Sequence, residues 1–279
     1  MKRSIPFILV ALLVVSGNAE AGRWTTDLSK ARSEARQKDR LMLADMYADW
    51  CGWCKKMAQE VFPAEAFQKA TEDLVLVKID TEDGGEGEDV ARQLGVSTLP
   101  TFLLLTHDLT IAGTIQGYMP ANEFARRLSV VRKEYAEFQV ALSSEDEHEN
   151  DIEWRLAFAK QLLNRRAFDE SIKRLDSLLS VKGLKTIDQQ DVLYHKAVAY
   201  AGKEKYESSI EALALLDRTA NGQLAERGSI LRAQIYYQQR AFADAVAELK
   251  RFKETYPNSA FLPNVNRMLP QFEVAARSR

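Results

Sequence analysis

The chain has few of the residues that would indicate a metal site or a nucleic-acid surface. It contains two cysteines and three histidines in 279 residues. A closed zinc site needs four ligands, and the three histidines lie far along the sequence from the cysteines, which disfavours zinc. The net charge is only −2, and lysines and arginines are dispersed among acidic residues instead of forming a basic stripe. This pattern excludes nucleic acid as a partner.

A long apolar segment is also missing. The apolar run at residues 5–15 is shorter than the roughly 20 residues that cross a bilayer. Lys2 and Arg3 precede it, and Ala19-Glu20-Ala21 follows as a small-residue cleavage pattern. We therefore predict a signal peptide over residues 1–21 and a protein exported to the periplasm. An uncleaved signal that anchors the chain to the membrane is the alternative.

Both cysteines lie in one short motif, Trp50-Cys51-Gly52-Trp53-Cys54-Lys55. The apolar run 41–47 before it predicts a buried strand, and Met57, Ala58 and Val61 predict a helix that follows and stops before Pro63. The motif should therefore sit at the N-terminal end of a helix. A thiol in that place faces unpaired backbone N–H groups and the positive end of the helix dipole, which favour the thiolate.

This placement assigns the two thiols different roles. Cys51, the first of the pair, is the predicted nucleophile. Cys54 lies one helical turn further on, where it can attack a mixed disulfide and release the substrate. The only cofactor expected is the redox-active disulfide between Cys51 and Cys54.

The surrounding pattern predicts an α/β domain. Thr26 is expected to cap a first helix, and strands are expected at 41–47, 74–79, 101–105 and 110–116. Between the second and third strands a short helix should end at Gly95, and a final amphipathic helix should begin near Ala121.

The segment 44–55, Ala-Asp-Met-Tyr-Ala-Asp-Trp-Cys-Gly-Trp-Cys-Lys, and the tripeptide Leu99-Pro100-Thr101 together resemble the thioredoxin superfamily. The resemblance is closest to exported thioredoxin-like proteins with a Trp-Cys-Gly-Trp-Cys-Lys motif, and it covers about residues 24–142. It implies a thioredoxin fold for residues 22–142 and thiol–disulfide oxidoreductase activity.

The resemblance also implies roles for individual residues. Pro100 would be the cis-proline beside the disulfide, and Leu99 would offer its backbone to a substrate strand. Asp45 would be the buried carboxylate that relays a proton to or from Cys54. The expected substrate-binding residues are Trp50, Gly52, Trp53, Leu99, Pro100 and Gly117.

Some of these residues also have plainer interpretations. Asp45 can be a strand-end carboxylate bonded to backbone, and Trp53 can simply pack against the protein. The lysine that often pairs with the buried carboxylate in this family falls at Leu76, while Lys78 lies two residues later on the same strand face.

Residues 143–151, Ser-Ser-Glu-Asp-Glu-His-Glu-Asn-Asp, contain no apolar residue and predict an acidic linker. Beyond it, residues 152–279 show paired amphipathic helices and resemble tetratricopeptide repeats. The aligned positions of the three units are Ala159, Ala197 and Ala233, then Phe168, Tyr206 and Phe242. A terminal stretch from 261 to 276 is expected to be broken by Pro270.

The sequence thus predicts an α/β thioredoxin fold followed by an all-α helical-repeat domain. The predicted function is reduction of disulfides in partner proteins, with electrons from a membrane donor and with a protein partner held on the helical repeats. A disulfide oxidase or isomerase is one alternative, and a non-catalytic repeat-based adaptor is another.

Overall fold

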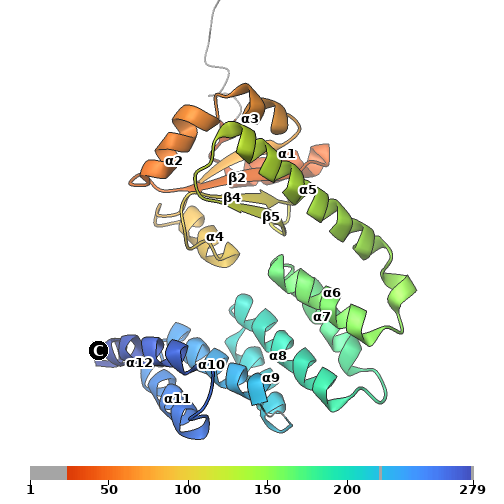
Figure 1. The fold of residues 1–279 in the computed structure, drawn as a ribbon, viewed down its shortest axis with the longest axis vertical. Helices are drawn as coiled ribbons and strands as arrows, with labels where there is room; N and C mark the ends of the chain where they lie inside the picture. The colour runs from red at the N-terminus through yellow and green to blue at the C-terminus, as the bar shows by residue number, and fades with distance from the viewer. Residues whose placement is uncertain (1–23, 220–221, 278–279) are drawn as a thin grey trace, which may run out of the picture.

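The computed structural model describes residues 24–219 and 222–277 (Figure 1). The predicted signal peptide lies outside the described residues. Within them, an α/β sheet domain is followed by a predominantly helical region. No helix in the described part of the chain is both long and apolar enough to cross a bilayer.

A five-stranded sheet forms the centre of the first domain, in the order β1-β3-β2-β4-β5. Its strands are β1 (Trp24–Thr25), β2 (Met42–Tyr47), β3 (Val75–Asp80), β4 (Thr101–Leu105) and β5 (Ile111–Gln116). The first three run parallel, whereas β4 is antiparallel to β2 and to β5. β2 reads as a continuous buried run because both faces of this central strand are covered.

Helices cover the two faces of the sheet. α1 (Leu28–Lys38) and α4 (Glu86–Leu94) pack on one face. The other face is covered by the helical turn η1 (Met57–Val61), which continues α2 (Gly52–Lys56), and by α3 (Glu65–Ala70) and α5 (Ala121–Ser143). The predicted strands and the helix end at Gly95 are confirmed, but β1 and α3 were not predicted.

The cap of the first helix differs from the prediction. Asp27, not Thr26, is the N-cap, and its carboxylate accepts a hydrogen bond of 2.8 Å from the backbone N–H of Lys30. A carboxylate also interacts favourably with the helix dipole, so the neighbouring Asp provides the stronger cap.

The acidic segment 143–151 joins the two parts. It contains a short 3-10 turn, η2 (Glu145–His148), and Asp151 caps the next helix. Glu145 pairs with Arg174 at 2.6 Å, and the ring of His148 stacks on Trp154 at a centroid distance of 4.2 Å. Much of this segment is therefore held against the helical region.

The helical region consists of consecutive helix pairs (Figure 1). Its helices are α6 (Ile152–Asn164) with α7 (Phe168–Leu179), α8 (Thr186–Gly202) with α9 (Tyr206–Asp217), α10 (Gly222–Gln238) with α11 (Phe242–Thr255), and α12 (Leu262–Arg277). The second helix of every pair begins at its aligned aromatic residue. The expected break at Pro270 is wrong, because α12 is one helix with Pro270 inside it.

Candidate active site

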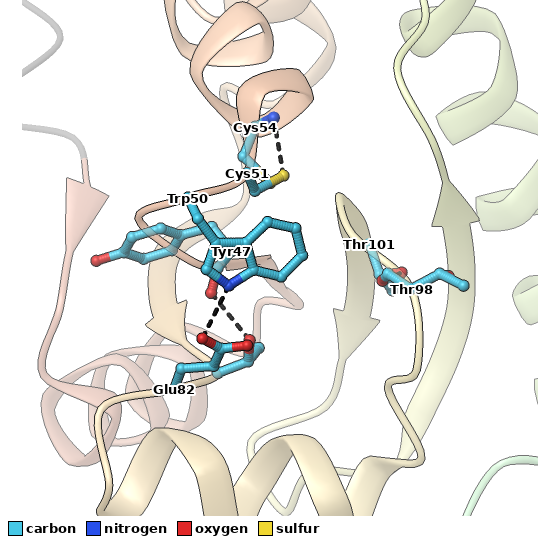
Figure 2. The surroundings of a disulfide bond; sticks show 8 residues. Tyr47, Trp50, Cys51, Cys54, Glu82, Thr98 and Thr101 are labelled. Carbon is cyan, nitrogen blue, oxygen red and sulfur yellow. Dashed lines mark hydrogen bonds between the residues drawn. A yellow bond between two sulfur atoms is a disulfide. The ribbon is translucent and has the colours of Figure 1, made fainter.

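The two cysteines form a disulfide at the start of α2 (Figure 2). Cys51 is the N-cap of this helix, and the backbone N–H of Cys54 donates to Cys51 Sγ at 3.1 Å. Their Cα atoms lie 5.3 Å apart. The same N–H, with the positive end of the helix dipole, would stabilise a thiolate at Cys51 once the disulfide is reduced.

Exposed aromatic rings surround the buried disulfide. Cys51 is 3% exposed, whereas Trp50 and Trp53 are 68% and 57% exposed. The Trp50 indole N–H donates to Glu82 Oε2 at 2.8 Å, as Figure 2 shows. Trp53 packs against Tyr118 at a ring distance of 5.3 Å. The apolar surface beside the disulfide is therefore made by these rings, each held by a second residue.

Glu82 and Tyr118 were not identified from the sequence. Tyr118 directly follows Gly117, so an aromatic residue beside a predicted site residue was an available signal. Glu82 is 32 residues from Trp50 and carried no such signal.

The Leu99–Pro100 peptide bond is cis and lies directly before β4. The Gly117 N–H donates to the Pro100 carbonyl at 2.8 Å, and Gly117 has a φ of 82°. A left-handed φ of this kind favours glycine. Gly117 therefore lets the chain turn directly after β5 while its N–H stays bonded to Pro100. Thr101 Oγ1 donates to the Thr98 carbonyl at 2.7 Å and fixes the loop before the proline (Figure 2).

The predicted substrate-binding residues lie together. Trp50 and Leu99 line one cavity of about 420 Å³. Gly117 bonds to Pro100, and its neighbour Tyr118 packs on Trp53. The loop at Leu99 and Pro100 and the segment at Gly117 and Tyr118, which are far from the cysteines in sequence, therefore meet beside the cysteine motif. Among the described residues, no three His, Cys, Asp or Glu side chains are grouped as a metal site requires.

Asp45 lies on β2 and is 3% exposed. It shares a sheet face with Leu43, which packs in the same cluster as Met57, one turn after Cys54. Its Oδ1 accepts no hydrogen bond from any described residue. Burial raises the pKa of Asp45 to about 7, and the positive charge of Lys78 partly opposes this shift.

Lys78 is the cation nearest in register to this carboxylate. The parallel ladder places Asp45 opposite Lys78, while Leu76 lies opposite Leu43. Three aromatic rings surround the Lys78 ammonium, with centroids 5.3 Å (Phe62), 5.5 Å (Trp24) and 5.9 Å (Tyr47) away. The position aligned with the family lysine therefore holds a buried leucine, and Lys78 supplies the charge from two residues later.

A cysteine pair at a helix N-terminus, a cis-proline loop and a buried carboxylate on the adjoining strand place the first domain in the class of thioredoxin-like proteins. The thioredoxin family model matches residues 24–130. Thioredoxin of Listeria monocytogenes is 32% identical over 97 residues, covering 35% of this chain and 88% of that protein. The chain belongs to the thioredoxin family.

Other relatives are longer proteins. The thiol:disulfide interchange protein DsbD of Actinobacillus pleuropneumoniae is 30% identical over 99 residues, which cover 34% of this chain and 17% of DsbD. Among solved structures, a thioredoxin from Thermus thermophilus is 24% identical, with a TM-score of 0.36, covering 39% of this chain and 85% of that one. The family model ends before residue 152, where the helical region begins.

Proposed function

We propose that the protein is an exported thiol–disulfide oxidoreductase that reduces disulfides in partner proteins. The observation that carries the proposal is the position of Cys51, an N-cap whose sulfur accepts a backbone N–H beside the Leu99–Pro100 loop. That position favours the thiolate needed for attack. The names of the relatives, thioredoxin and thiol:disulfide interchange protein, agree with this chemistry.

The proposed reaction has two exchange steps. In the reduced protein, the Cys51 thiolate attacks one sulfur of the substrate disulfide, and the other substrate sulfur leaves as a thiolate. Cys54 then attacks Cys51 Sγ, the intramolecular disulfide forms, and the second substrate sulfur leaves. Two electrons pass from the protein dithiol to the substrate.

The second step needs a deprotonated Cys54. Asp45 is proposed to accept this proton, because a carboxyl with a pKa of about 7 takes up and releases protons near neutral pH. Its free Oδ1 is available for the proton. Substrate backbone is proposed to lie against Leu99, which precedes β4 and so is outside the ladder of the sheet.

The oxidised protein must be reduced again for a second turnover. We propose a membrane dithiol donor, in keeping with the export signal predicted at residues 1–21. The helical region is proposed to act as tetratricopeptide-like repeats that hold the partner protein and raise its effective concentration at Cys51. Oxidase or isomerase activity and a purely adaptor role are the competing functions.

The reduction potential tests the direction of electron flow. The protein would be equilibrated in glutathione buffers and followed by tryptophan fluorescence, because Trp50 and Trp53 flank the disulfide. We expect a reversible transition near the thioredoxin potential of about −270 mV. A potential near −120 mV would instead show an oxidant.

Trapping tests the two cysteine roles against the adaptor function. Cys54→Ser should accumulate mixed disulfides through Cys51, because the resolving step is removed. Cys51→Ser is the matched control and should trap nothing. If the Cys51→Ser protein still fulfilled the cellular role, the adaptor function would replace the reductase.

A further inference from the structure

The helical region contains a cavity of about 700 Å³ formed by α6, the start of α7, α8 and α10. Apolar and aromatic side chains make up much of its wall, including Phe168, Tyr194 and Leu231. Three cations also line it, and no aspartate or glutamate does; the cations are Lys160, Arg166 and Arg227. The volume falls in the range of ligand-binding clefts.

This cavity is joined to the active site through shared walls. The cavity at Trp50 and Leu99 shares Arg92 with a second cavity of about 190 Å³ between α4 and the helical region. The second cavity in turn shares Arg166, Gly202 and Leu231 with the large one. In Figure 1, α4 lies on the side of the sheet that faces α8 and α10. The three cavities thus follow one another through shared lining residues, from Trp50, which directly precedes Cys51, into the helical region. We call this series of cavities the groove.

The charges along this groove are unevenly distributed. Glu82 and Glu88 line the cavity at the disulfide, and in the middle Arg92 pairs with Glu204 at 3.8 Å. Positive charge therefore gathers at the end distant from the disulfide.

Two of the cations at the distant end are unpaired. Among the ion pairs of the described residues, none involves Arg166 or Arg227. Arg166 lies 5.6 Å from the Phe168 ring and fills the space beside Gly95, and burial lowers the pKa of its guanidinium. Lys160, by contrast, is already paired with Asp191. A partly desolvated arginine without a carboxylate partner favours an anionic ligand.

We infer that the groove binds an extended segment of the substrate protein, continuous with its disulfide, whose acidic side chains contact Arg166 and Arg227. This inference rests on the proposed reductase function and deepens it by naming the substrate class. An extended segment fits because the three cavities follow one another, and each shares lining residues with the next. The apolar walls at Tyr194 and Leu231 would accept the intervening side chains.

The test compares disulfide peptides that share one cysteine core and differ in a distant tail. The tail carries a run of glutamates or of lysines, at increasing separations from the cysteine and on either side of it. Full-length reduced protein is mixed with each peptide, and the second-order rate constant of peptide reduction is measured under single-turnover conditions. At one separation we expect about a tenfold preference for the glutamate tail, which added salt reduces.

Variants locate the preference. Arg227→Glu should abolish or reverse it, because the exposed guanidinium is replaced by a like charge to the tail. Arg126→Glu, an exposed change on α5 that lines none of these cavities, should retain it. If a variant fails to fold, the rates of the wild-type protein with the glutamate and lysine tails still show whether the groove prefers an acidic segment.

The outcomes separate the two proposals. Equal rates for glutamate and lysine tails at every separation, with both peptides reduced, would overturn the groove and leave the reductase function standing. A preference unchanged by Arg227→Glu would also overturn it. Failure to reduce any peptide, or glutathione disulfide, would overturn the reductase function and the groove together.

Discussion

At Asp45, a single buried carboxyl links protonation to the stability of the fold. Its pKa is about 7 in the folded protein against an ordinary value of 3.8. Between these pH values the folded state binds more protons than the unfolded state, so the free energy of unfolding falls as pH rises. The difference of about three pKa units corresponds to roughly 4 kcal/mol, at 1.36 kcal/mol for each unit.

Asp45→Asn tests this linkage, because the amide does not titrate. Urea unfolding of the oxidised proteins would be measured at pH 5 and pH 8. The wild type should lose roughly 2 to 3 kcal/mol more than the variant between these values, since most of the titration toward the folded pKa of about 7 lies in this window. Parallel pH dependence in the two proteins would show that folding does not raise the pKa of Asp45.

The cysteine motif could be predicted because its chemistry is local. The two thiols, their spacing and the start of the helix all depend on neighbouring residues in the sequence. The sequence placed Lys78 on the correct strand face, but it could not show which residue of β3 lies opposite Asp45. Alignment of strand sequences points to Leu76, but the observed ladder sets Asp45 opposite Lys78. Register depends on how two strands pack across the whole sheet, and a single sequence does not contain that information.

At the scale of the element, the helical pairs repeat one turn. A residue with positive φ lies two positions before the first residue of every second helix; these are Arg166, Glu204 and Arg240, with φ of 61°, 56° and 59°. The aligned aromatics predicted where these helices begin. The turn conformation was not predictable, because none of the three residues is the glycine that normally marks a left-handed position.

A buried hydroxyl joins the two helices in two of these pairs. Ser171 donates to the Ala159 carbonyl at 2.8 Å, and Ser209 donates to the Ala197 carbonyl at 2.7 Å. Ala245 occupies the same position of the third pair, so alanine fits there sterically.

Ser209→Ala should therefore lower the free energy of unfolding by about 1 kcal/mol, the net value of one hydrogen bond. Ser208→Ala, at the neighbouring and less buried position, is the control and should change it by less than about 0.5 kcal/mol. Thermal or urea unfolding measures both. Equal effects would mean that the hydroxyl of Ser209 contributes nothing beyond its packing.

Across the whole molecule, the helical region is docked on the open edge of the sheet. The backbone N–H of Ile111, on edge strand β5, donates to the Arg165 carbonyl at 2.8 Å. The Arg165 guanidinium returns hydrogen bonds to the carbonyls of Ile111 and Ala112, at 3.1 and 2.7 Å, and lies 4.2 Å from the Phe138 ring. Sequence patterns predicted both parts but not this contact, since no periodicity records which turn meets which strand.

Arg165→Ala should loosen the docking and lower the free energy of unfolding by about 2 to 3 kcal/mol, because it removes hydrogen bonds from a half-buried cation to buried carbonyls. Urea unfolding would measure the loss, and limited proteolysis within residues 143–151 would report separation of the two parts. Arg126→Ala, on the exposed side of α5, is the matched control and should change neither. If Arg165→Ala resisted the protease as the wild type does, the two parts of the protein would be held together without this arginine. Other contacts between the two parts, such as that of Arg166 with Gly95, would then keep the cavities of the groove side by side.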